Sequence, residues 1–177
     1  MNHGVLFCMA ILFSLFVLPR VAYASYVLPY PSYMPGNKMY RVTRLMDRMK
    51  APFYFGNLSS FRYHLALSDK YLVEAKTLFE YKQYLLAVDA LKRSDKEFSD
   101  VPQYLQKARK EGKDIRAFES LYNEAAQEHT RVLKSLLSTL PESFEWSPEK
   151  VASTTLSLKD MINTSIALRG ISIGRIK

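Results

Sequence analysis

The amino-acid sequence predicts an all-α protein, built from a short N-terminal amphipathic helix and an antiparallel bundle of about four longer helices. Apolar residues recur at spacings of three and four along most of residues 37–170, which is the period of a helix with one buried face. The connections between these periodic segments are short, and short connections make consecutive helices antiparallel neighbours. No alternating strand pattern of comparable length interrupts them.

The short amphipathic helix is expected near residues 37–50. It follows Pro35-Gly36, and Pro52 forbids its continuation. Residues 52–56, Pro-Phe-Tyr-Phe-Gly, then form an aromatic turn. The apolar positions of the helix are Val42, Leu45, Met46 and Met49.

The same helix holds the candidate residues for binding an anionic surface, all of them basic: Lys38, Arg41, Arg44, Arg48 and Lys50. Arg41, Arg44 and Arg48 are three and four residues apart, so they lie close to one face. Such a helix can lie on an anionic surface. It can equally pack its apolar side on the bundle and leave its arginines in water, and we expect this second arrangement.

The most regular periodicity begins at Leu58 and predicts a helical hairpin. Its first helix covers residues 58–80, with only Ser68 breaking the apolar series, and its second covers 83–98. The polar connection between them is so short that the two helices must be antiparallel. We expect this hairpin to form the middle of the core.

Two more long helices are expected after the hairpin. Pro102 suits the first turn of a helix over 102–140, and Gly112 is the position where that helix either kinks or breaks. Ser147 and Pro148 form a favourable helix start, so the last helix is expected over about 148–169.

The first 24 residues have the features of a secretory signal peptide. Residues 5–18 are an almost unbroken apolar run, too short to span a bilayer, and small residues at 22 and 24 predict cleavage after Ala24. We therefore expect export to the cell envelope, the periplasm or the exterior, with an uncleaved membrane anchor as the alternative. An extended Pro/Tyr-rich arm (25–36), a single helical domain (37–170) and a basic tail (171–177) follow.

Composition narrows the classes of partner and of chemistry. The only cysteine, Cys8, lies in the predicted signal peptide, so the remaining chain has no disulfide or thiolate chemistry. Residues 25–177 carry 24 Lys and Arg against 17 Asp and Glu, a formal charge of +7. This balance favours an acidic protein, an anionic lipid or a cell-wall polymer as partner, and outside the cytoplasm no nucleic acid is expected.

No catalytic, metal-binding or cofactor-binding constellation is recognisable. Only His64 and His129 remain after the predicted cleavage, and both lie on or beside apolar stripes, where a packed histidine is the usual interpretation. Metal-ligand spacings, a serine elbow and a phosphate-binding glycine loop do not occur in the sequence. We expect no enzyme and no cofactor.

Several segments between Leu28 and about Phe98 resemble a bacterial family of exported or membrane-tethered helical domains of unknown function. The resemblance is carried by Leu28-Pro29, the stretch Pro35 to Tyr40, the basic helix, the aromatic turn and the stretch Leu65 to Ala75. It implies export and a helical fold, and it contributes no site residue. Residues 75–98 also resemble one tetratricopeptide hairpin, although a solenoid needs about three repeats.

The sequence therefore predicts a secreted or envelope-associated helical domain that acts as a structural or protein-interaction module. The alternative is a peripheral module that binds anionic lipid or wall polymer through the basic helix. An enzyme of unrecognised type is the third hypothesis.

Overall fold

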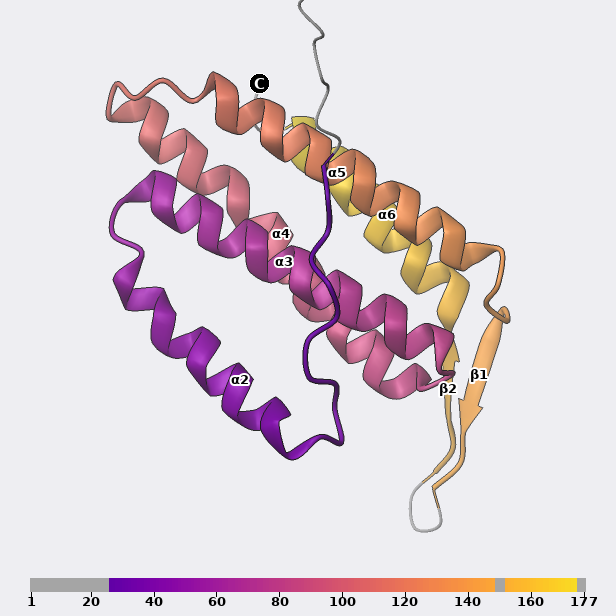
Figure 1. Ribbon diagram of the computed structural model, residues 1–177. Coiled ribbons are helices and arrows are strands. Elements are labelled where there is room, and N and C mark those ends of the chain that lie inside the picture. Colours follow the sequence, from indigo (N-terminus) through magenta and orange to yellow (C-terminus); the bar gives the residue numbers. More distant parts are fainter. Residues whose placement is uncertain (1–25, 149–151, 175–177) are drawn as a thin grey trace, which may run out of the picture.

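Four long helices pack around one core. In the computed structural model, which describes residues 26–148 and 152–174, these are α3 (Asn57–Glu80), α4 (Tyr84–Lys110), α5 (Arg116–Leu137) and α6 (Leu158–Gly174). They form an antiparallel bundle in which α3 and α6 each contact both α4 and α5 (Figure 1). A fifth helix, α2 (Lys38–Lys50), lies outside the bundle and leads through the 3-10 turn η1 (Ala51–Phe53) into α3. The predicted all-α fold class is confirmed.

Both α3 and α4 end in the same capping motif, which forms the first two of the three connections of the bundle. After α3 the backbone N–H of Gln83 donates to the carbonyl of Leu78 at 2.8 Å, and after α4 that of Lys113 donates to Ala108 at 3.1 Å. This motif requires a left-handed residue, and the positions are held by Lys82 (φ 58°) and Gly112 (φ 75°). Gly112 therefore ends a helix completely, where the sequence alone left a kink or a break open.

Pro102 does not start a helix, contrary to our prediction, and lies inside α4 instead. A proline there lacks the N–H that would bond to the carbonyl of Phe98. That carbonyl accepts a hydrogen bond from the Tyr122 hydroxyl of α5 at 3.1 Å, so the lost helical bond is replaced. The predicted boundary between the helices 83–98 and 102–140 is thus wrong. The helix that begins at Tyr84 continues to Lys110, and the turn to the next helix lies at Gly112.

The last helix begins ten residues later than predicted. Residues 143–146 and 154–157 form the antiparallel strands β1 (Ser143–Trp146) and β2 (Thr154–Ser157), and α6 starts only at Leu158. Phe144 pairs with Leu156, and its ring lies 4.9 Å from that of Tyr84, which ties the hairpin to the end of the bundle (Figure 1). The helix continues through Gly170 to Gly174, into the segment that we predicted as a tail.

The arm of residues 26–36 crosses α3 on its way to α2 (Figure 1). It contains neither helix nor strand. The side chains of Leu28 and Met34 pack against the core, and Tyr30 is almost fully exposed. The predicted signal peptide, residues 1–24, and the end of the predicted tail, 175–177, lie outside the described residues.

The core consists of two apolar clusters separated by polar side chains. One cluster lies at the end of the bundle that carries the α3–α4 turn and includes Leu72, Leu91 and Leu133. The other lies toward the opposite end and includes Phe61 and Phe98. Each of the four bundle helices contributes to the polar layer between these clusters, whose members are Ser68, Asp69, Ser94, Asp95, His129, Ser165 and Arg169.

Candidate functional site

Helix α2 turns a polar face toward the bundle. Asp47 is its only buried residue, and its carboxylate pairs with Lys70 of α3. The Tyr63 hydroxyl donates to the Asp47 backbone carbonyl at 2.7 Å, and the Tyr40 hydroxyl donates to Glu74 at 2.6 Å. These three polar contacts fix the rotation of α2 about its axis.

The Tyr40 phenol keeps its proton over the whole physiological pH range. Burial and the bond to Glu74 raise the pKa of Tyr40 to about 12, so the phenol remains a donor. Glu74 also pairs with Arg93 at 2.9 Å. Tyr40 of α2 therefore bonds to a carboxylate, Glu74, whose charge is already balanced by Arg93.

The apolar stripe of α2 faces away from the bundle, and this contradicts our expectation that it would pack inward. Leu45 is 58% exposed and Met49 is 61% exposed. The stripe continues past the helix into the aromatic turn, where Phe53 is 75% and Phe55 82% exposed. The four helix faces of the bundle cover one another, so they leave no place in the core for a fifth stripe. The exposed stripe consists of Met39, Val42, Leu45, Met46, Met49, Phe53 and Phe55.

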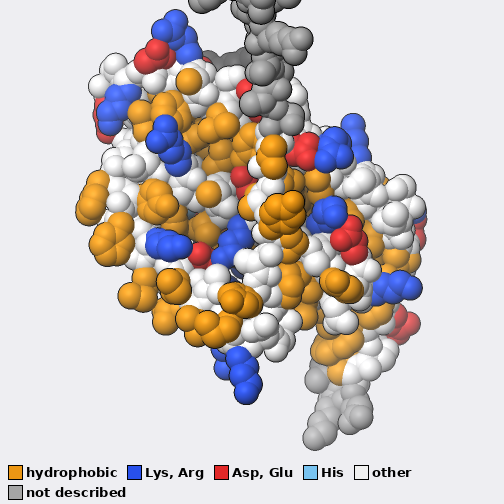
Figure 2. Space-filling view, in the orientation of Figure 1, with side chains coloured by type: hydrophobic (Ala, Val, Ile, Leu, Met, Phe, Trp, Pro, Cys, Tyr) orange, Lys and Arg blue, Asp and Glu red, His pale blue; other side chains and the backbone are white. Residues whose placement is uncertain are grey.

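The predicted basic residues surround this stripe. Lys38, Arg41, Arg48 and Lys50 are exposed, whereas Arg44 is half-buried. The guanidinium of Arg44 lies 5.8 Å from the centre of the Tyr40 ring. From here on, the exposed apolar stripe together with Lys38, Arg41, Arg44, Arg48 and Lys50 is called the α2 surface. Figure 2 shows orange apolar groups gathered over α2, with Lys and Arg side chains beside them.

The buried polar layer holds a histidine and carboxylate pair. His129 Nε2 lies 2.7 Å from Asp69, whose other oxygen accepts the Tyr26 hydroxyl at 2.5 Å. Burial lowers the pKa of His129, so the ring is neutral at pH 7 and Nε2–H is the donor. Its Nδ1 is buried and meets no hydrogen-bond partner in the described part of the chain. Because the ring is fully buried, the pair offers no face to a substrate and serves packing.

His64 is also held by its neighbours. Its Nδ1 lies 2.6 Å from Glu97, and its Nε2 lies 2.8 Å from the Tyr104 hydroxyl. The His64 and Tyr104 rings are stacked with their centres 4.8 Å apart. Both ring nitrogens are thus occupied by structural contacts between α3 and α4.

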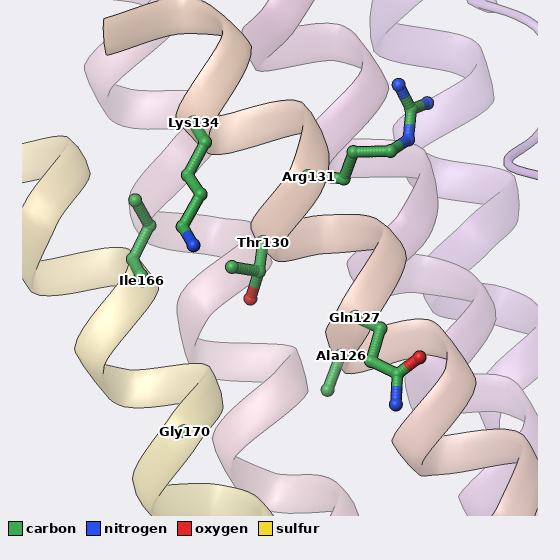
Figure 3. Close-up of a pocket in the computed structure, with 7 residues that line it drawn as sticks. All are labelled: Ala126, Gln127, Thr130, Arg131, Lys134, Ile166 and Gly170. Atoms are coloured by element: carbon green, nitrogen blue, oxygen red, sulfur yellow. The ribbon is translucent and has the colours of Figure 1, made fainter.

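A groove of about 440 Å³ runs between α5 and α6 (Figure 3). Thr130 and Lys134 of α5 point toward it, and Ile166 of α6 forms part of its wall. Arg131 points away and is held by Glu128 at 2.6 and 2.8 Å. The groove is lined mainly by apolar groups, and Lys134 points into it. These groups do not form an acid-base pair or an activated nucleophile. Across residues 26–148 and 152–174, no three His, Cys, Asp or Glu side chains converge as metal ligands.

Comparison with known proteins identifies the family and no activity. No curated protein and no solved structure matches the chain. Within the residues that the structure describes, no helix has the length and apolar character needed to cross a bilayer. A family model described as "Domain of unknown function (DUF5667)" matches residues 32–143, which include α2 and the helices α3, α4 and α5. Since this match extends over more than half of the 177 residues, the chain belongs to the DUF5667 family of domains.

Proposed function

We propose that this domain is a non-enzymatic peripheral module that binds an anionic membrane surface through the α2 surface. The observation that carries the proposal is the outward orientation of the apolar stripe, bordered by basic residues. An amphipathic helix at a membrane interface buries its apolar face at the level of the acyl chains and keeps its basic residues among the head groups. The polar contacts of Asp47 and Tyr40 hold α2 in the orientation that such binding needs.

The energies of the two components are comparable. Each basic residue near an anionic membrane contributes about 1 kcal/mol. Burial of one Phe or Met side chain contributes about 1.5–3 kcal/mol. Phe53 and Phe55 extend the apolar stripe beyond the end of the helix, so the lipid-facing surface is longer than α2 itself. The strength of binding rises with the buried apolar area and with the attraction to anionic lipid, so both components contribute.

The exposed stripe favours lipid over the other anionic partners. A cell-wall polymer is hydrophilic, so it attracts the arginines and leaves Met49, Phe53 and Phe55 in water. An acidic protein with an apolar groove would cover both components. The apolar residues form an exposed stripe with basic side chains around it, which is the pattern of an interfacial helix. Attachment to a membrane surface also agrees with the predicted export.

The proposal is tested by retention of the full chain on vesicles made of equal parts phosphatidylcholine and phosphatidylglycerol. Arg41→Glu with Arg48→Glu should reduce the vesicle partition coefficient on the order of a hundredfold. Both residues are exposed and form no ion pair among the described residues, so the fold should be unaffected. Because residues 1–24 are the same in every variant, the difference between variants reports on α2.

A matched control applies the same change of charge elsewhere. Lys110→Glu with Lys134→Glu, at exposed positions on α4 and α5, should leave retention within about threefold of the wild type, because these residues do not face the membrane. Equal losses in both double variants would show that only net charge matters. Unchanged retention after reversal at Arg41 and Arg48 would overturn the proposal.

A second variant separates lipid from the alternatives. Phe53→Ser with Phe55→Ser should weaken retention on the vesicles by at least about tenfold, since it removes apolar area from the bilayer contact. Retention on purified wall polymer depends on charge alone, so the same variant should have no effect there. Wild-type retention on wall polymer or on an acidic protein, with none on vesicles, would replace the membrane as partner.

A further inference from the structure

Among the arginines that the structure describes, the three of the α2 surface differ from most others in lacking an acidic partner. Arg41, Arg44 and Arg48 form no ion pair with any described carboxylate, and Arg62 lies over the Phe118 ring. The arginines that do pair with a carboxylate are Arg93, Arg109, Arg116, Arg131 and Arg169. Of the four described arginines without a carboxylate partner, three therefore lie on α2 and one, Arg62, lies on α3.

These three arginines line a common hollow. It has a volume of about 390 Å³, and Tyr40 and Leu45 complete its wall. The first and last arginine are seven residues apart, which is about 10 Å along the helix axis. Arginine side chains are long enough for all three guanidinium groups to contact one small ligand across this distance.

The hollow is preorganised at its inner side. Arg44 lies beside the Tyr40 ring, and the Tyr40 hydroxyl is held by Glu74 at 2.6 Å and by Arg93 at 3.2 Å. The nearby carboxylates of Glu74 and Asp47 are already paired with Arg93 and Lys70. The three guanidinium groups of the hollow therefore have no described carboxylate as an ion-pair partner.

The guanidinium N–H groups that line the hollow are suited to bind a phosphate group. A guanidinium presents its N–H groups as a planar fork that binds two phosphate oxygens at once, and several forks suit a dianion better than a monoanion. Leu45 belongs both to the hollow and to the apolar stripe, so the arginines lie at the depth of the head groups when the stripe contacts the acyl chains. We propose that the hollow binds the phosphomonoester head group of an anionic lipid. This inference rests on the proposed membrane binding and adds selectivity to it.

The test compares two anionic lipids at matched surface charge. Vesicles with phosphatidic acid, which carries a terminal phosphomonoester, and vesicles with phosphatidylglycerol, a phosphodiester, are adjusted to the same zeta potential. The wild-type chain should prefer phosphatidic acid by about tenfold, the effect of one additional charge-assisted contact. Arg41→Lys, Arg44→Lys and Arg48→Lys together keep the charge and remove the forks. This triple variant should retain the phosphatidylglycerol affinity and lose the preference.

Controls distinguish the possible outcomes. Arg109→Lys, Arg116→Lys and Arg131→Lys together make the same chemical change at exposed sites and should keep the preference. Equal wild-type affinity for the two lipids would overturn the head-group site and leave the proposed membrane binding intact. Absence of retention on either lipid would overturn both.

Inorganic phosphate alone, followed by NMR of the arginine Nε–H signals, tests whether the hollow binds free phosphate. Saturation by inorganic phosphate without any vesicle preference would assign the hollow to free phosphate and overturn the lipid assignment.

Discussion

Asp47 of α2 pairs with Lys70 of α3, and this contact determines which side of α2 faces the bundle. Both side chains are largely buried at 12% and 19% exposure. An ion pair in this position is more strongly constrained than a surface pair, because removal of one partner leaves the other charge poorly solvated. Because this contact turns the polar side of α2 toward the bundle, the apolar stripe on the other side of the helix is exposed.

Asp47→Ala should loosen α2 from the bundle. Lys70 loses its partner, at a cost of about 1–3 kcal/mol, and α2 has few other contacts to hold it. Backbone amides of α2 should therefore exchange with solvent at least about fivefold faster, while those of α4 are unchanged. Hydrogen exchange measured by mass spectrometry checks this. Lys76→Ala, which breaks the exposed Lys76–Glu80 pair, is the control and should change little. Unchanged exchange in α2 after Asp47→Ala would contradict the role of the pair.

The buried pair of Arg169 and Asp95 should dominate the stability of the polar layer. Arg169 is fully buried, bonds to the Ser94 hydroxyl at 3.0 Å and lies 5.3 Å from the centre of the Phe98 ring. Asp95→Ala should cost about 3–5 kcal/mol, because it leaves a buried guanidinium without a counter-charge. Combining it with Arg169→Met should recover most of that loss. Urea unfolding of both single variants and the double variant measures the coupling, and additive losses would contradict it.

Leu72 and Leu45 provide a matched comparison of a buried and an exposed leucine. Leu72 is fully buried in the middle of the core, whereas Leu45 lies on the α2 surface. Leu72→Ala should lower the free energy of unfolding by about 2–5 kcal/mol, since it removes buried apolar atoms and leaves a cavity. Leu45→Ala should change it by less than about 0.5 kcal/mol. Equal losses in thermal melts of the two variants would show that α2 packs its apolar side inward after all.

The stability of the protein should fall as the pH decreases from 7.5 to 5.5. Burial lowers the pKa of His129 in the folded state, so the unfolded chain binds a proton at a higher pH than the folded chain does. The stability that this neutral ring provides is complete above the unfolded pKa of about 6.5 and is lost as the pH falls toward the folded pKa. The slope cannot exceed about 1.4 kcal/mol per pH unit for one group.

Urea unfolding at several pH values measures this slope. His129→Gln should reduce it, because the titrating group is removed. His64→Gln is the matched control at a partly exposed site, and it should retain the contribution of His129. A slope that is identical in the wild type and in His129→Gln would show that other groups cause the pH dependence.

The sequence by itself determined the fold class, the first hairpin helix and the extent of α2. Helical spacing is a local property, and it placed α3 and α2 to within one residue because Pro52, Gly56 and the connection around 81–83 break the backbone pattern. It also identified the basic residues of α2. Ser68, the one interruption of the stripe, belongs to the polar layer. Its partner Ser94, and the layer residues Asp95 and Arg169, lie on other helices and could not be assigned from spacing.

Only the tertiary structure decided which side of α2 is covered and where the later helices begin. An amphipathic pattern shows that two faces differ, and the partner decides which of them is buried. Here the core is complete with four stripes, so the polar bonds of Tyr40 and Asp47 orient α2. Pro102 stays within a helix because Tyr122, distant in sequence, satisfies the carbonyl that proline leaves free. The strands β1 and β2, four residues each, are too short to give a local signal, and they form through pairing with each other and packing against Tyr84.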